Sequence, residues 1–267
     1  MDLMYSISGF AVGVLVGITG VGGGSLMTPL LVFLFNFQPA VAVGTDLLYA
    51  AITKTGGVAV HHGKHQSVDW RVVGLLSIGS LPLAIATLFA IRYFMSVGTE
   101  TTGAISWSLG LALILTSTAL LVRAALLRGR VDAKDHEASM QSSARFQSGG
   151  EIPMTILIGA VLGVLVTLSS VGAGALGTVA LLFLYPRAST LKIVGTDLAH
   201  AIPLTAIAGM GHWLLGNVNF TLLGSLLIGS LPGIWLGSHL SAKIPEKWLR
   251  PFLALILMII GLKFVLS

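Results

Sequence analysis

The sequence predicts an all-α integral membrane protein made of two inverted structural repeats, each a re-entrant or broken helical hairpin plus three transmembrane helices. The first observation is composition: 55% of the residues are hydrophobic and 9% are charged, whereas a typical soluble domain has about 25% charged residues. The second is a row of long apolar segments, and the third is a pattern that returns after about 150 residues. We therefore expect the lipid bilayer as the main partner and no nucleic acid.

The repeat rests on four short motifs that occur in the same order in both halves. They are VGGGSL at 21–26 and VGAGAL at 171–176, VGTDL at 43–47 and 194–198, SVD at 67–69 and NVN at 217–219, and IGSLP at 78–82 and 228–232. Four matches in one order indicate a duplication rather than chance. We expect a first transmembrane repeat at 1–127, a cytoplasmic linker loop at 128–152 and a second transmembrane repeat at 153–267.

Each repeat divides into a hairpin and three longer helices. The expected helices are Tyr5–Gly20, Ser25–Phe37, Gly44–His61, Arg71–Tyr93 and Ser106–Leu127, and then Met154–Ser170, Ala175–Tyr185, Gly195–Leu214, Phe220–Leu240 and Trp248–Leu266. A full span needs about 20 residues, so the second member of each first pair is too short to cross. The linker is polar and charged, which predicts a flexible loop.

Positive charge predicts the orientation. With the linker inside and the halves inverted, twelve of the 15 Lys and Arg residues lie on the inner side, including Arg123, which we count with the linker although it lies near the end of the preceding helix. Only Arg92 and Lys263 lie outside, and Lys54 lies within a helix. This asymmetry follows the positive-inside rule and places both termini outside.

Glycine-rich breaks interrupt the apolar segments at 20–24 and 171–175. Lipid cannot satisfy the exposed backbone of a broken helix, so such breaks line cavities, and matching breaks mark a transporter's substrate site. Each helix that restarts offers unpaired N–H groups and a partial positive charge to an anion. The expected substrate-binding residues are Thr19, Gly22, Gly23, Gly24, Ser25, Lys54, Ser169, Ser170, Gly172, Ala173 and Gly174. The alternative is that these glycines only permit close helix packing, which we expect for Gly9, Gly13, Gly17, Gly159 and Gly163.

Lys54 is the basic residue furthest from a helix end. A lysine at mid-bilayer costs about 2.5–3.5 kcal/mol, so intramembrane lysines usually serve function. We expect Lys54 to attract an anion into the pathway. The alternative is a structural lysine paired with a carbonyl, or one that extends towards the interface. Its counterpart in the second repeat is Thr205.

Asp46, Asp197, His200 and His212 are candidates for coupling or gating. One reading is proton coupling, with one acid serving each side of the membrane. The slightly favoured reading is capping, because the threonine before each aspartate is a good N-cap and an acid in the first turn stabilises the helix dipole. The histidines are either proton relays or simply hydrogen-bonded side chains.

Cofactor sites are not expected. Residues 172–177 read G-x-G-x-x-G with Asp197 20 residues later, as in a dinucleotide site. The flanks are uncharged, however, and lack the strand and the amphipathic helix that such a site needs. His61, His62 and His65 do not make a closed zinc site, and the chain has no cysteine. No metal and no catalytic residues are predicted.

The glycine-rich break, the Gly-Thr-Asp-Leu and Gly-Ser-Leu-Pro motifs and their duplication resemble the TauE/SafE sulfite exporter family of bacterial anion transporters. The resemblance implies a multi-pass protein of the inner (plasma) membrane that moves small sulfur-containing anions, namely sulfite, thiosulfate or an organosulfonate. It implies secondary active transport by alternating access with ion or proton coupling, and no cofactor. The alternatives are a passive anion channel, an intramembrane enzyme and an accessory membrane subunit.

Overall fold

The computed structural model describes residues 3–19, 24–65, 68–98, 102–134, 150–240 and 246–266. Within these ranges the chain is entirely helix and connecting turn, which confirms the all-α membrane fold. The helices are α1 Leu3–Thr19, α2 Gly24–Phe33, α3 Pro39–His65, α4 Trp70–Ser96, α5 Thr102–Lys134, α6 Glu151–Ser169, α7 Leu176–Leu184, α8 Thr190–Leu214, α9 Phe220–Leu240 and α10 Glu246–Leu266. By length and apolar composition, five helices of the described chain are able to cross a membrane: α4, the first part of α5, α6, α8 and most of α9.

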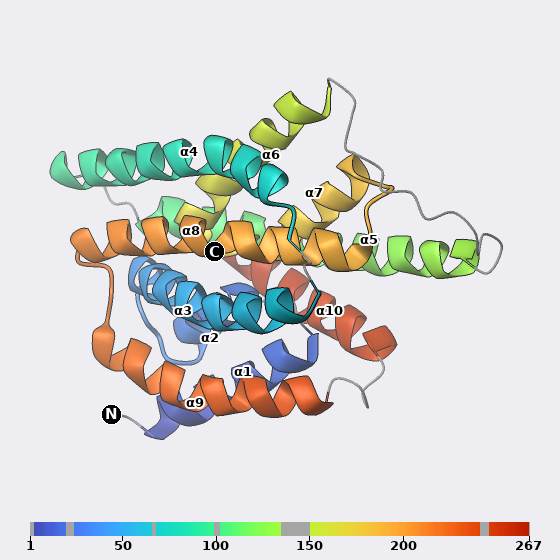
Figure 1. Ribbon diagram of the computed structural model, residues 1–267. Helices are drawn as coiled ribbons and strands as arrows, with labels where there is room; N and C mark the ends of the chain where they lie inside the picture. Colours follow the sequence, from blue (N-terminus) through green and yellow to red (C-terminus); the bar gives the residue numbers. More distant parts are fainter. Residues whose placement is uncertain are drawn as a thin grey trace.

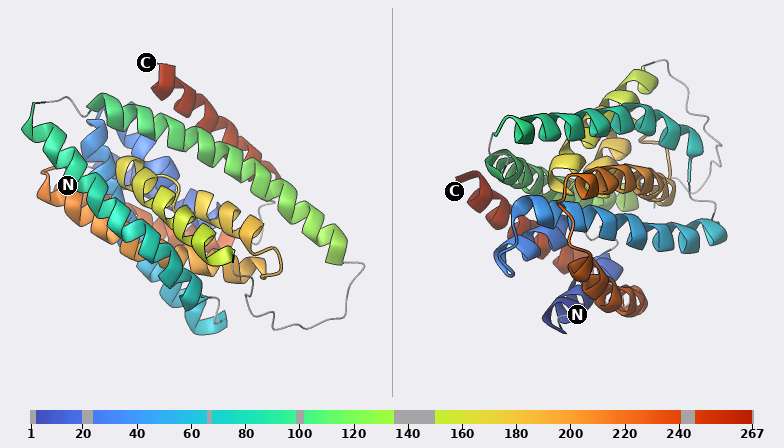
Figure 2. Two further views of the ribbon diagram at one scale, coloured as in Figure 1. Left: turned by 90° about the horizontal axis from the view of Figure 1, so that it is seen from above. Right: turned by 90° about the vertical axis from the view of Figure 1, so that its left-hand side faces the viewer.

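Equivalent helices of the two halves run in opposite directions. In Figure 1, α3 runs from left to right and α8 from right to left, and the same reversal relates α4 to α9. The α3/α8 pair lies in the middle of the bundle, between an α1/α9 pair on one face and an α4/α6 pair on the other (Figure 2). Each half therefore contributes its first helix to a pair with the fourth helix of the other half.

Glycines make the two outer helix pairs possible. A side chain at Gly9 or Gly13 of α1 would collide with the backbone of α9. The equivalent glycines of α6, Gly159 and Gly163, lie in the same way against the backbone of α4. Small residues allow helix backbones to approach this closely in a membrane. The expectation that these Gly-x3-Gly rows serve packing is confirmed.

The central helices begin earlier than the sequence predicts. α3 starts at Pro39 and α8 at Thr190, rather than at Gly44 and Gly195. The Gly-Thr-Asp motif resembles a helix start, but buried apolar residues precede it in both halves, Val43 in α3 and Ile193 in α8, and no helix-ending residue intervenes. Asp46 and Asp197 lie about two turns inside their helices. The favoured capping reading is therefore wrong, because an N-cap or first-turn acid must lie at the helix start.

α5 continues beyond the expected end of the first repeat. It reaches Lys134, so the beginning of the predicted linker is helical. Arg123 lies within this helix and is only 5% exposed. We counted Arg123 with the linker, whereas its side chain is buried in the bundle and does not face solvent. The remaining eleven basic residues still outnumber those assigned to the outer side.

Candidate functional site

The second glycine-rich break joins α6 to α7 in the interior. α6 ends at Ser169, and Ser170 adopts a left-handed conformation with φ 59°. Gly172 and Gly174 have φ values of 114° and 119°, which side chains of L-residues rarely tolerate. The glycines therefore shape this break in addition to leaving space around it.

The break offers hydrogen-bond donors rather than acceptors. Its carbonyls are occupied: Gly172 O accepts from the amide of Leu176 at 3.0 Å, and Gly174 O accepts from the Thr178 hydroxyl at 2.7 Å. The carbonyl of Ala173 accepts from Lys54. In contrast, within the described part of the chain, the amides of Ala173 and Gly174 donate to no partner. Unpaired amides at the start of α7 suit an anion and do not suit a cation.

Lys54 reaches this break from the other half of the molecule. The side chain is 4% exposed, and its Nζ donates to the carbonyl of Ala173 at 3.1 Å. The expected alternative of a lysine paired with a carbonyl is thus part of what the structure shows. That carbonyl, however, belongs to the residue whose amide is an expected anion donor. The ammonium group therefore lies beside the expected anion site.

The two serines of the break have different surroundings. Ser169 Oγ donates to Leu165 O at 2.6 Å and accepts from the amide of Val171 at 3.1 Å, so it ends α6. Ser170 is 3% exposed and lies next to the Asp46 carboxyl. Among the described residues no group is at hydrogen-bonding geometry to its hydroxyl. Of the two, Ser170 is the hydroxyl available to a ligand.

Asp46 and Asp197 have equivalent environments in the two halves. Thr28 of α2 donates to Asp46 Oδ2 at 2.5 Å, and Thr178 of α7 donates to Asp197 Oδ2 at 2.7 Å. The aspartates are 0% and 1% exposed, and in the described structure the second oxygen of each has no hydrogen-bond partner. Each short helix after a break is thus tied to an acid on a central helix.

Gly177, the third glycine of the G-x-G-x-x-G pattern, has a structural explanation. A Cβ there would collide with Oδ1 and Cγ of Asp197. The glycine therefore allows the Asp197 carboxyl to lie against α7. The equivalent position in the first repeat is Met27, so this contact is not duplicated.

The two histidines lie at different levels of α8. His200 Nε2 is 2.8 Å from Ser80 Oγ of α4, and its Nδ1 has no partner among the described residues. His212 Nε2 donates to the carbonyl of Thr167 at 2.9 Å and ties α8 to α6. His212 is about 22 Å along the helix from Asp197, whereas His200 is one turn away. The structure thus places His200, and not His212, near the acids.

The first break lies mainly outside the described residues, which include neither Gly22 nor Gly23. Thr19 ends α1, and Gly24 and Ser25 begin α2, but only their backbone is described. The proposed contribution of these five residues to substrate binding stays a prediction.

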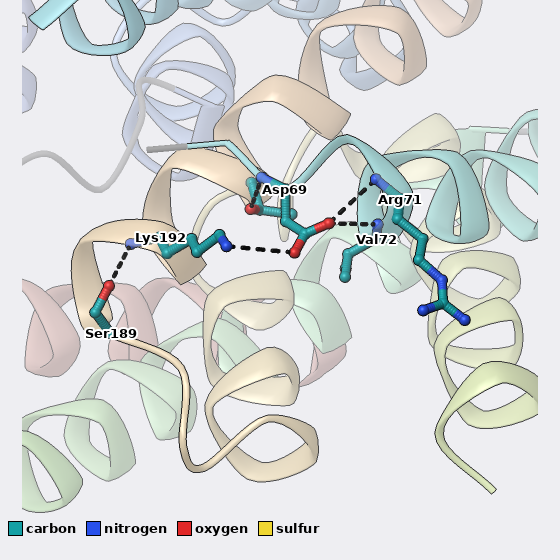
Figure 3. Close-up of polar contacts among 6 residues, drawn as sticks. Asp69, Arg71, Val72, Ser189 and Lys192 are labelled. Carbon is teal, nitrogen blue, oxygen red and sulfur yellow. Dashed lines mark hydrogen bonds and ion pairs between the residues drawn. The ribbon is translucent and has the colours of Figure 1, made fainter. Parts of the chain in front are cut away.

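A second pair of equivalent contacts joins the halves at the two ends of the bundle. The Asp69 amide donates to Thr196 Oγ1 at 2.9 Å, and the Asn219 amide donates to Thr45 Oγ1 at 3.0 Å. Figure 3 shows the Asp69 carboxylate between the amides of Arg71 and Val72, which it caps, and the Lys192 ammonium, 3.7 Å away. The threonines of the Gly-Thr-Asp motifs thus hold the first residues of the opposite half's fourth helix.

Sequence reasoning missed four of these groups: Thr28, Thr178, the buried Arg123 and the contacts of Asp69 and Asn219. The threonines were detectable, because Thr28 and Thr178 are separated by the repeat offset of 150 residues. The burial of Arg123 had no such signal, since α5 runs without interruption into basic sequence.

Comparison with known proteins agrees with this architecture. The family described as "Sulfite exporter TauE/SafE" matches residues 5–264. The chain is 36% identical over 226 residues, 85% of each chain, to "Probable membrane transporter protein YjnA" of Bacillus subtilis. It is 27% identical over 218 residues, 79% of this chain and 72% of the relative, to "Probable membrane transporter protein MJ0441" of Methanocaldococcus jannaschii. No solved structure matches. The chain belongs to the TauE/SafE family of membrane transporters.

Proposed function

We propose that this protein is a secondary transporter of small sulfur-containing anions (sulfite, thiosulfate or an organosulfonate) that works by alternating access in the inner (plasma) membrane. The observation that carries the proposal is the second break. Its carbonyls are occupied, the amides of Ala173 and Gly174 are available, and Lys54 lies beside them. Donors and a buried cation in a region shielded from water select for anions.

Sulfur oxyanions fit this chemistry. Their oxygens accept several hydrogen bonds at once, and the Ser170 hydroxyl adds a donor next to the two amides. The description of the matching family as a sulfite exporter supports the same class of substrate. The first break, with Gly22, Gly23 and Gly24, completes the site from the other half in this proposal.

We further propose that the halves are inverted across the membrane, with the linker cytoplasmic. Equivalent helices that run in opposite directions support this (Figure 1), as does the excess of basic residues on one side. Because the chain has no cysteine, single cysteines are clean probes. Gln141→Cys should be protected from an impermeant thiol reagent added outside, and Glu100→Cys should react. The opposite pattern would exclude this topology.

Ligand screening tests the substrate class. Purified protein should show a rise in the midpoint of thermal unfolding with sulfite, thiosulfate or methanesulfonate, because a ligand of the native state stabilises it. Acetate and chloride are the controls and should give a smaller rise. An equal response to every anion, or none to the sulfur anions, would contradict the proposal.

Uptake into proteoliposomes distinguishes a transporter from a passive channel. A secondary transporter should accumulate the labelled anion against its gradient when an ion gradient is imposed. Uptake that stops at equal concentrations under every imposed gradient would indicate the channel instead.

A further inference from the structure

A small cavity lies near the end of the bundle where α4 and α8 begin. It is lined by residues of α4, α7 and α8, including Leu181, which follows Gly174 of the break by about 10 Å along α7. The cavity has room for roughly one water molecule, which is less than an oxyanion needs. In the proposed topology it lies on the cytoplasmic side of the break.

Three polar groups close this cavity and come from both halves. Lys192 of α8 has its Nζ 3.7 Å from Oδ2 of Asp69, which precedes α4 (Figure 3). The Asp69 amide donates to Thr196 Oγ1 at 2.9 Å, and Thr196 is 2% exposed. Within the described chain the hydroxyl hydrogen of Thr196 has no acceptor. A cation and a buried hydroxyl donor therefore line the cavity, and the Asp69 carboxylate lies against the cation.

The contact between Lys192 and Asp69 is easily separated. Its length of 3.7 Å exceeds the 2.7–2.9 Å or so of a charge-assisted hydrogen bond. The Lys192 side chain is also 45% exposed, and ion pairs of exposed groups are weak. Asp69 has further partners, because it accepts from the amides of Arg71 and Val72. Lys192 is therefore able to exchange Asp69 for an anion while α4 keeps its cap.

The equivalent end of the other repeat has a different closure. By the repeat offset, Val41 corresponds to Lys192 and Asn219 corresponds to Asp69, so neither equivalent position is charged. Gly44 lies so close to the turn before α9 that a Cβ there would collide with its backbone. The charged pair is thus a feature of the α4/α8 end and is not part of the duplicated framework.

We propose that this cavity is the closed inner mouth of the anion pathway, with Asp69 as its gate and Lys192 as a transit site. In the closed state Asp69 neutralises Lys192. When the mouth widens, the Lys192 ammonium and the Thr196 hydroxyl hold a small oxyanion on its way between the break and the cytoplasm. The inference rests on the proposed function, because it requires the anion to move to and from the break.

A reporter cysteine tests the transit site, since the chain has no cysteine of its own. Ala188 lines the cavity, so Ala188→Cys in purified protein reports access through its rate of reaction with methyl methanethiosulfonate, an uncharged reagent. Methanesulfonate at ten times its dissociation constant should slow this reaction about tenfold. Sodium chloride at the same ionic strength is the control and should not.

Two further variants in the Ala188→Cys background assign the protection to Lys192. Lys192→Gln should abolish it. Arg71→Gln is the matched control, because it removes one positive charge from the same end of the bundle. The Arg71 side chain is directed away from Lys192 (Figure 3), so protection should remain. Protection that is absent from the parent reporter, that survives Lys192→Gln or that is lost in Arg71→Gln would overturn the inference.

Asp69→Asn tests the gate. Asparagine keeps the helix cap and the amide bond to Thr196 but removes the ion pair. Labelling of Ala188→Cys without anion should therefore become faster, by up to about fivefold for a pair of this exposure. An unchanged or slower rate would overturn the role of Asp69 as the gate.

Thermal stabilisation of the same proteins by methanesulfonate reports the interior site separately. Stabilisation without protection of Ala188→Cys would overturn this inference alone. The absence of stabilisation by any sulfur anion would overturn the proposed function and the inference with it.

Discussion

The central helices α3 and α8 share a buried aspartate, but only α3 carries a buried lysine. Each has a buried aspartate, Asp46 or Asp197, that is bonded by a threonine from the short helix after a break. Two turns further along, α3 has Lys54, whereas α8 has Thr205, which only bonds back to its own helix at Ala201 O. The acid is duplicated and the cation is not. We infer that the acids serve a task that both halves perform, whereas the lysine serves the single substrate.

The largest effect should come from removing the charge of Lys54, which has no counterpart in α8. Lys54→Met keeps much of the apolar length and removes the charge. Two charges about 4 Å apart interact by about 4 kcal/mol at an effective dielectric constant of 20. Anion transport should therefore fall by about 100-fold or more, measured as the initial uptake rate at matched reconstitution levels. The matched control is Thr205→Val in the equivalent position, which should change the rate less than about threefold, because Thr205 has only a local hydrogen bond.

Lys54→Arg tests whether the positive charge itself supports transport. It retains the charge on a larger planar group, so part of the transport activity should remain. Transport by Lys54→Met at the parent rate over a range of substrate concentrations would show that the lysine is structural.

The next largest effect should come from the break itself. Gly174→Ala places a Cβ on a residue with φ 119° and beside the expected amide donors. Anion binding should weaken by tenfold or more, on the order of 1.4 kcal/mol, measured by ligand-dependent thermal stabilisation. Gly216→Ala is the control, since Gly216 has φ 79° and open space around it at the end of α8. Equal loss of binding in both variants would indicate backbone strain rather than a site.

The hydrogen bond from a threonine to a buried aspartate occurs in both halves, so its loss should lower stability by a similar amount in each. Thr28→Val and Thr178→Val each remove the hydroxyl that bonds a buried aspartate, which should lower the free energy of unfolding by about 1–3 kcal/mol. Thermal unfolding of both variants under the same conditions measures this. If one variant loses stability and the other does not, the two acids are not equivalent, and the comparison fails.

The smallest effect concerns the ends of the bundle. Asp69 caps α4 and Asn219 caps α9, so Asp69→Ala and Asn219→Ala should each cost about 1 kcal/mol. Asp69→Ala also loses the ion pair with Lys192, which is 45% exposed. The stability loss of Asp69→Ala should therefore exceed that of Asn219→Ala by less than about 1 kcal/mol. This difference should disappear in high salt, and it is measured from the unfolding midpoints of the two variants. An excess that persists in high salt would contradict this reading.

Much of the architecture was predictable because duplication is visible in sequence. The motifs around Gly172 and Gly174, the Gly-x3-Gly rows and the Asp46/Asp197 pair all occur at the repeat offset, and the structure uses each in the break, in close packing or in a matched hydrogen bond. Lys54 stood out because a charge is rare in a long apolar segment. Repeats and rare charges are signals that do not require knowledge of tertiary contacts.

The remaining features depend on tertiary packing. The starts of α3 and α8 were misplaced because Gly-Thr-Asp resembles a cap locally, whereas core packing extends both helices by more than a turn. The threonines that precede the aspartates cap nothing of their own and instead hold Asp69 and Asn219 of the opposite half. Arg123 is buried although it lies close to the basic end of α5, and no local pattern in the sequence indicates that this arginine lies inside.

The most direct test of the anion site is a crystal structure with selenite, whose anomalous scattering locates the ion. The account predicts a peak in the interior, within hydrogen-bonding distance of the amides of Ala173 and Gly174 and of Lys54 Nζ, and the loss of that peak in Lys54→Met. A peak found only at the end of the bundle near Lys192, or an interior peak away from residues 172–174, would contradict the assignment of the break as the substrate site.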